Sequence, residues 1–119
     1  MTGNHLVTYN SVMNEDEVFK ALADKTRRML LDRLCERGGL NLSELCAQLN
    51  MSRQAAMKHL GILEHANLIL IKWSGREKLH FLNPAPIQET YGRWVNKFEQ
   101  HRAQALDSLK QSFETKKEN

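Results

Sequence analysis

Two short helical segments, each with its own capping signal and joined by a tight turn, constrain this fold more than any other feature. Asn41 is followed three residues later by Glu44, which is a capping-box pattern. Ser52 stands where it can cap the next segment. These signals predict one helix over about residues 43–49 and a second over residues 53–66, joined at the turn "NM". We therefore expect a helix-turn-helix unit in the middle of the chain.

Apolar periodicity predicts two further helices before this unit. The first has a short apolar face around Val18 and Phe19, with acidic residues in its first turn, where the helix dipole favours them. The second begins after Asp24 as its N-cap and ends before Gly38. Its predicted core positions are Met29, Leu30, Leu31 and Leu34. Alanine and leucine positions of the segment 53–66, and Met57 with them, are expected to face the same core.

After residue 67 the period of the sequence changes. Residues 68–73 are rich in β-branched and aromatic side chains, "SGRE" is typical of a turn, and residues 78–82 alternate. The pattern predicts a β-hairpin with a basic tip. Its second strand would carry Leu79 and Phe81 on one face and Lys78 and His80 on the other. We expect His80, like His5 and His65, to be solvated.

A long helix is predicted at the end of the chain, over residues 84–115. Pro84 and Pro86 suit the first positions of a helix, where a missing N–H costs nothing. Apolar residues then recur at steps of three or four. The stripe consists of Ile87, Tyr91, Trp94, Phe98, Ala105, Leu109 and Phe113. Such a stripe needs a surface to pack against.

The predicted order of elements is that of a winged helix-turn-helix. The fold class is mainly α with a small β-hairpin (α+β), extended by helices at both ends. A chain of 119 residues with 41% hydrophobic content suits one domain. Within it we expect a flexible segment 1–14, a DNA-binding core 15–83 and a C-terminal dimerisation helix 84–115 that belongs to the same domain. We expect no membrane span and a cytoplasmic protein, because neither a long apolar run nor a signal peptide is evident.

Basic charge is concentrated around the second helix of the unit and the hairpin. Between residues 50 and 80 five cations face only two anions, an excess equal to the net charge of +3 of the whole chain. In a winged helix the second helix enters the DNA major groove with its N-terminal residues toward the bases. Arg53 and Gln54 suit guanine and adenine edges, whereas Ser52 and Lys58 suit phosphate oxygens. For His59 phosphate contact and packing remain equal alternatives.

The hairpin completes the predicted DNA-binding surface. Arg76 lies at its tip, with Lys72 and Lys78 beside it. These cations can contact the DNA backbone or enter the minor groove. Double-stranded DNA is therefore the expected partner, and we expect the mutual placement of the three side chains to form one basic wing.

Three segments together resemble the ArsR/SmtB family of winged helix-turn-helix repressors. They are "ALADKTRRMLLDRL", "LSELCAQLNMSRQAAMKHLGILEHANLI" and "GREKLHFLNPAPI", followed by a tryptophan-bearing helix. The chain is similar to the metal-independent branch of that family. The resemblance implies a homodimeric repressor that binds an inverted repeat. Its implied dimer interface is formed by Val18, Phe19, Tyr91, Trp94, Phe98, Leu109 and Phe113. Met57 departs from the family by replacing a small hydroxyl residue, which removes one expected DNA contact, and Asn67 replaces a usual glycine.

Metal sensing of the kind found elsewhere in the family is not expected here. Cys46 matches the first cysteine of one metal site, but Gln48 occupies the partner position. On the final helix His101 and Asp107 lack the paired spacing of the other site. We therefore predict no metal and no cofactor, and no small-molecule effector is evident. Cys35 and Cys46 are expected to be small buried side chains.

Two alternatives to a DNA-binding repressor remain open, and an enzyme is not one of them. The chain has no nucleophile-base pattern, no glycine-rich phosphate loop and no paired metal ligands. One alternative is a winged-helix module that binds protein instead of DNA. The other is a repressor whose DNA binding responds to thiol chemistry at Cys35 and Cys46.

Overall fold

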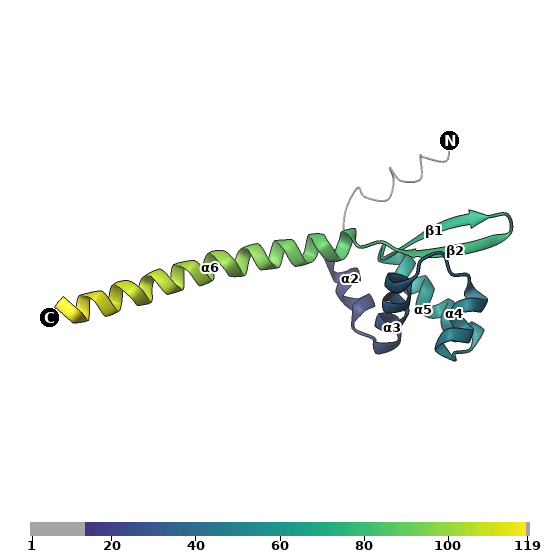
Figure 1. The fold of residues 1–119 in the computed structure, drawn as a ribbon, viewed down its shortest axis with the longest axis horizontal. Helices are drawn as coiled ribbons and strands as arrows, with labels where there is room; N and C mark the ends of the chain where they lie inside the picture. Colours follow the sequence, from purple (N-terminus) through teal and green to yellow (C-terminus); the bar gives the residue numbers. More distant parts are fainter. Residues whose placement is uncertain (1–13, 119) are drawn as a thin grey trace, which may run out of the picture. The chain divides into compact units, whose positions relative to one another are not determined.

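The computed structural model describes residues 14–118, and the chain divides into two compact units (Figure 1). The first unit ends at Ile87 and the second begins at Gln88. The segment predicted to be flexible, residues 1–14, lies outside the described residues except for Asn14, and His5 lies outside them as well. No helix within residues 14–118 has the length and apolar character needed to cross a membrane. The assignment of the final helix to the same domain stays a prediction.

Four helices form the first unit, and each starts at a side-chain cap. They are α2 Glu15–Leu22, α3 Lys25–Glu36, α4 Leu42–Leu49 and α5 Arg53–His65. The predicted capping box is present at α4, where the Glu44 N–H donates to Asn41 Oδ1 and the Asn41 N–H donates to Glu44 Oε1, each at 2.8 Å. Ser52 Oγ likewise accepts from the Ala55 N–H at 3.1 Å. The predicted helix-turn-helix unit is thus α4 and α5.

Residues with a positive φ turn the chain between these helices. Asn50, at φ 50°, ends α4, and Asn67, at φ 62°, follows α5. Asparagine tolerates this left-handed conformation better than other residues with a Cβ. Gly39 adopts φ 82° after α3. The expectation that Asn67 keeps the backbone role of a glycine is confirmed.

The hairpin consists of β1 Ile69–Ser74 and β2 Glu77–Leu82, paired antiparallel. Gly75, at φ 63°, makes the tight turn between them. In this register Trp73 pairs with Lys78 and Ile71 with His80. Residues directly opposite in a sheet share a face, so these four side chains lie on one side of the hairpin.

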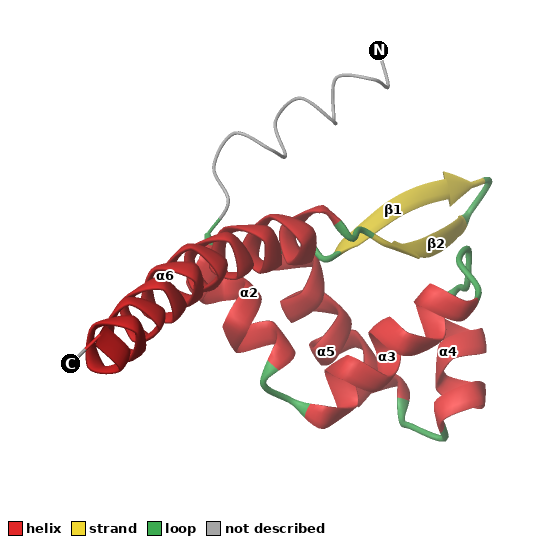
Figure 2. Cartoon of the chain, turned by 60° about the vertical axis from the view of Figure 1, so that its left-hand side comes forward, coloured by secondary structure: helices red, strands yellow, loops and turns green. Residues whose placement is uncertain are grey.

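The core of the first unit is arranged around α3, which contacts α2, α4, α5 and β2 (Figure 2). Its buried residues are mainly leucines of the four helices, together with Leu40, Leu68 and Ile69. Two of the predicted core positions are wrong, because Met29 is 42% exposed and Met57 is 56% exposed. On both helices the residues next to the apolar stripe continue the pattern in sequence but point away from the helix partner.

Two arginines of α3 bind the carbonyl groups left unpaired at the end of α2. Arg27 donates from Nε to the Ala21 carbonyl at 2.8 Å and from Nη2 to the Lys20 carbonyl at 3.1 Å. Arg28 Nη1 donates to the Leu22 carbonyl at 2.6 Å. The last carbonyls of a helix have no partner within it, so these bonds join α2 to α3.

The second unit is formed by α6, a helix that spans Ala85–Glu118 and begins just after the predicted Pro84. Large apolar side chains along it are exposed in this chain. They are Tyr91, Trp94, Phe98, Leu106, Leu109 and Phe113. The rings of Trp94 and Phe98 are tilted, with centroids 6.2 Å apart, and Lys97 Nζ lies 5.0 Å from the Trp94 ring centroid. The predicted stripe is thus present and uncovered.

The α2–α3 junction can be tested with Arg27→Ala. We expect it to lower the free energy of unfolding by about 2 kcal/mol, because two charge-assisted hydrogen bonds of a mostly buried side chain are lost. Urea denaturation measures the change. Arg37→Ala, at an exposed position at the end of the same helix, is the control and should change stability by less than ~0.5 kcal/mol. Equal effects of the two variants would contradict the assigned role.

Asp24 adds a pH dependence at the same junction. The Arg27 N–H donates to Asp24 Oδ1 at 3.1 Å, and this bond lowers the pKa of the Asp24 carboxyl below its ordinary value of 3.8. The cap therefore contributes its full stability above pH 3.8 and loses it as the pH falls through the lowered pKa. Asp24→Asn, which keeps an acceptor, should remove this contribution to the acid transition measured by circular dichroism.

Candidate nucleic-acid interface

The predicted DNA-reading residues lie at the exposed front of α5. Arg53, Gln54 and Lys58 are exposed, and Ser52 caps the helix just before them. Burial of the opposite face explains this orientation, since Ala56, Leu60 and Leu63 are all in or next to the core. A helix whose apolar stripe is fixed in this way has no freedom to turn its polar residues inward.

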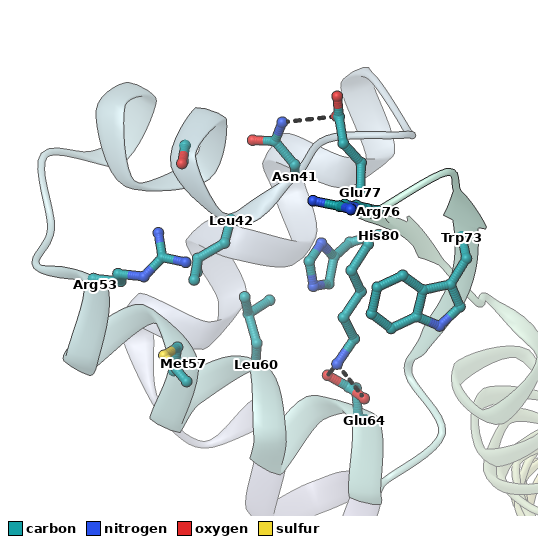
Figure 3. Close-up of a pocket in the computed structure, with 12 residues that line it drawn as sticks. Asn41, Leu42, Arg53, Met57, Leu60, Glu64, Trp73, Arg76, Glu77 and His80 are labelled. Atoms are coloured by element: carbon teal, nitrogen blue, oxygen red, sulfur yellow. Dashed lines mark hydrogen bonds and ion pairs between the residues drawn. The ribbon is translucent and has the colours of Figure 1, made fainter.

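A cleft of about 410 Å³ separates α5 from the hairpin, with the start of α4 at its edge (Figure 3). Arg53, Met57 and Leu60 line it from α5. Trp73 and Arg76 line it from the hairpin. The cleft therefore combines cations with apolar side chains, and it lies wholly within the first unit.

The three predicted wing cations are not brought together. Arg76 and Lys78 line the cleft, and Lys78 Nζ forms an ion pair with Glu64 Oε2 at 3.3 Å. Lys72 pairs with Leu79 in the hairpin and so faces the other side from Lys78. The prediction of one basic wing is wrong in this respect, because the odd number of residue steps between Lys72 and Trp73 reverses the face.

His80 is buried, which contradicts the prediction that it is solvated. Its side chain is 3% exposed, and its Nδ1 lies 2.8 Å from the Leu40 carbonyl oxygen. A carbonyl only accepts, so Nδ1 carries the proton and donates. The physical reason is a β-bridge between Leu40 and His80, which places the polar face of β2 against the helices. His65, by contrast, is exposed as predicted and lies 3.7 Å from Glu17 Oε1.

Phe81 packs on the opposite side of β2, over the glycines that follow α3. A Cβ at Gly38 would lie only 2.7 Å from Phe81 Cδ2, and one at Gly39 would lie 3.3 Å from Phe81 Cζ. Glycine is therefore required here for close approach as well as for the turn. These contacts hold the base of the hairpin against the helices.

His59 is half-buried, and its Nδ1 lies 3.3 Å from Arg27 Nη1. A guanidinium only donates, so Nδ1 accepts and Nε2 carries the proton. Packing is thus established for His59, and its Nε2–H remains available in principle to a phosphate oxygen. Contact with DNA stays a prediction.

The predicted dimer residues divide into two groups. Val18 is 1% exposed, because it belongs to the core of its own unit, and so it offers no surface to a partner. Phe19 on α2 is exposed. The α6 residues of the group, Tyr91, Trp94, Phe98, Leu109 and Phe113, are exposed as well.

The cysteines differ from expectation in one case. Cys35 is exposed, although a buried side chain was predicted, because the core positions of α3 end with Leu34. Cys46 is half-buried. Among the residues that the structure describes, no three His, Cys, Asp or Glu side chains gather in a group suited to a metal ion.

Comparison with known proteins gives a consistent result. A helix-turn-helix domain family model matches residues 22–71. An HTH-type transcriptional regulator of Bacillus subtilis, YuzN, is 40% identical, over 69% of this chain and 96% of that protein. The transcriptional repressor SdpR of the same organism is 31% identical, over 68% of this chain and 89% of that protein. Among solved structures, an ArsR-like transcriptional regulator from Rhodococcus sp. RHA1 is 31% identical with a TM-score of 0.69, over 82% of this chain and 90% of that chain.

The chain belongs to the ArsR family of helix-turn-helix transcriptional regulators. The predicted fold class and family are thereby confirmed, and this ArsR-family protein belongs to a class of DNA-binding regulators and not of enzymes. Sequence reasoning missed the Lys78–Glu64 ion pair and the buried His80. The only signal for either was the alternation of β2, which gives the two faces but not which of them is buried.

The buried His80 can be tested with His80→Ala. We expect the free energy of unfolding to fall by about 2 to 3 kcal/mol, because a packed ring and a buried hydrogen bond are lost. His65→Ala, at an exposed position, is the matched control and should cost less than ~1 kcal/mol. Urea denaturation monitored by tryptophan fluorescence measures both, and a similar small cost for both would contradict the packing role of His80.

Proposed function

We propose that this ArsR-family protein is a homodimeric repressor that binds an inverted-repeat operator in the cytoplasm. One observation carries the proposal: the exposed front of α5 holds donors suited to DNA, and the buried face of the same helix fixes their direction. In this arrangement α5 enters the major groove, and the hairpin contacts the backbone or the minor groove. The name of the relative SdpR, a transcriptional repressor, supports repression.

The residues at the front of α5 take different roles in this proposal. Arg53 binds guanine O6 and N7 through two donors, and Gln54 pairs with adenine N6 and N7. Lys58 and the Ser52 hydroxyl bind phosphate oxygens, as His59 Nε2–H also does if the phosphate reaches it. The bases are thus read by the first turn of the helix, and the phosphates set its position.

On the hairpin we assign the main DNA contact to Arg76. It is exposed at the turn and lines the cleft next to α5. Lys78 takes a smaller part, because its charge already offsets that of Glu64. Lys72 lies on the other face, so it contacts DNA only where the backbone curves around the hairpin. Arg76→Ala should therefore weaken binding to all sequences evenly.

The exposed apolar stripe of α6 supports dimerisation. Five large apolar side chains along one helix are a costly surface to leave in water, and a second copy of the helix is the partner that the family resemblance implies. We propose Tyr91, Trp94, Phe98, Leu109 and Phe113 as the interface, with Phe19 adding to it. Residues 15–115 then form one functional molecule, with the two α5 helices about one turn of DNA apart.

The dependence of binding on salt tests the function directly. Binding to DNA releases counterions, so the logarithm of the association constant should fall linearly with the logarithm of salt concentration, with a slope of about −0.9 for each phosphate contacted. Fluorescence anisotropy with labelled duplexes at several KCl concentrations measures the slope. A protein-binding module without DNA contacts would show no binding to duplex even at low ionic strength.

Base reading can be tested with Arg53→Ala. We expect this variant to lose about 1 to 3 kcal/mol of discrimination at one base pair of each half-site, because the bidentate contact is lost. Sites selected from a random duplex pool by the variant and by the wild type measure the change. Arg37→Ala, at an exposed position of α3, is the control and should select the wild-type site. An unchanged preference of Arg53→Ala would contradict its role as a reader.

The dimer interface can be tested with Phe98→Ala. The substitution removes two aromatic rings from each dimer, so we expect the dissociation constant of the dimer to rise by about a hundredfold or more. Gln100→Ala, on the opposite face of α6, is the matched control and should leave the dimer intact. Analytical ultracentrifugation over a range of concentrations measures both, and an unchanged dimer mass for Phe98→Ala would count against the α6 stripe.

A further inference from the structure

Met57 is an apolar side chain on the surface that reads DNA. It is 56% exposed, although its neighbour Ala56 is buried in the core. It lies one helical turn beyond Arg53, and both side chains line the cleft between α5 and the hairpin (Figure 3). Met57 thus belongs to the same face as the proposed guanine reader and not to the packing face of the helix.

The chemistry of Met57 limits what it can recognise there. A thioether has no hydrogen to donate, and its sulfur accepts only weakly. In the major groove the base pairs present donors and acceptors, and one apolar group, the C5-methyl of thymine. A flexible and polarisable methionine side chain packs well on such a methyl group. A phosphate contact, by contrast, would place the same side chain against a charge with no compensation.

We propose that Met57 contacts a thymine methyl group and so requires a thymine close to the base that Arg53 reads. Four residues along a helix correspond to about 6 Å, and successive base pairs are about 3.4 Å apart. The thymine therefore lies within about two base pairs of the Arg53 position in each half-site. This inference rests on the proposed binding of α5 in the major groove.

The neighbours of Met57 strengthen this assignment. Leu60, one turn further along, is buried at the back of the cleft, so the direction of Met57 is set by the packing of the helix. Across the cleft lies Trp73, which is exposed as well. Water is therefore easily excluded from the space around Met57 when DNA occupies the cleft, and that is the condition under which an apolar contact stabilises a complex.

Replacement of thymine by deoxyuridine removes only the methyl group, and it tests the proposal directly. The wild type first selects a site from a random duplex pool. Each thymine of that site is then replaced singly by deoxyuridine, and affinity is measured by fluorescence anisotropy at fixed salt. We expect one thymine in each half-site, within about two base pairs of the Arg53 guanine, whose replacement weakens binding about fourfold.

Variants of the protein assign the effect to Met57. Met57→Ala should bind thymine and deoxyuridine duplexes equally, whereas Met57→Leu, which stays apolar, should still prefer thymine. Met29→Ala, which truncates the other exposed methionine, on α3, is the matched control and should keep the wild-type ratio. The ratio is read within each protein, so a general change of affinity leaves it unaffected.

The outcomes separate this inference from the proposed function. If the wild type selects a site but no deoxyuridine substitution near the guanine matters, or if Met57→Ala keeps the preference for thymine, the inference is wrong and the DNA-binding function stands. If the wild type binds no duplex at low ionic strength, the proposed function itself fails.

Discussion

The burial of one face of α5 is the constraint on which the rest of the molecule depends. Ala56, Leu60 and Leu63 face the core, which is built around α3, and this fixes the rotation of the helix about its axis. Side chains about half a turn away must then point outward. The cations and the amide at the front of α5 are therefore held in place by packing before any partner arrives, so binding need not order the helix.

A second constraint sets the position of the hairpin relative to α5. The His80 ring donates to the Leu40 carbonyl, and on the other face of β2 Phe81 lies over Gly38 and Gly39. The strand is thus held by a hydrogen bond on one side and by close packing on the other. Farther along the hairpin the Lys78–Glu64 ion pair joins it to α5 across the cleft. The width of the cleft follows from these contacts, and the cleft is the space in which Arg53, Met57 and Arg76 come together.

Much of this could be predicted from the sequence, because the signals are local. The caps at Asn41 and Ser52, the left-handed Asn67 and the alternation of β2 depend on a few neighbouring residues each, and the order of elements follows from them. What failed depends on distant contacts. The burial of His80 requires Leu40 to pair with β2, and the exposure of Met57 depends on which neighbours α5 meets. Periodicity gives the faces of a helix or strand, and only tertiary packing decides which face is covered.

The account's central claim is that the exposed front of α5 and the adjacent hairpin turn form the surface that meets DNA. Amide chemical shifts of isotope-labelled protein, followed during titration with duplex at low ionic strength, test it most directly. We expect the large changes to cluster at residues 52–58 and around Arg76, with smaller ones along the cleft. Changes confined to the far side of the first unit, or to the α6 stripe, would contradict the claim even if the duplex were bound.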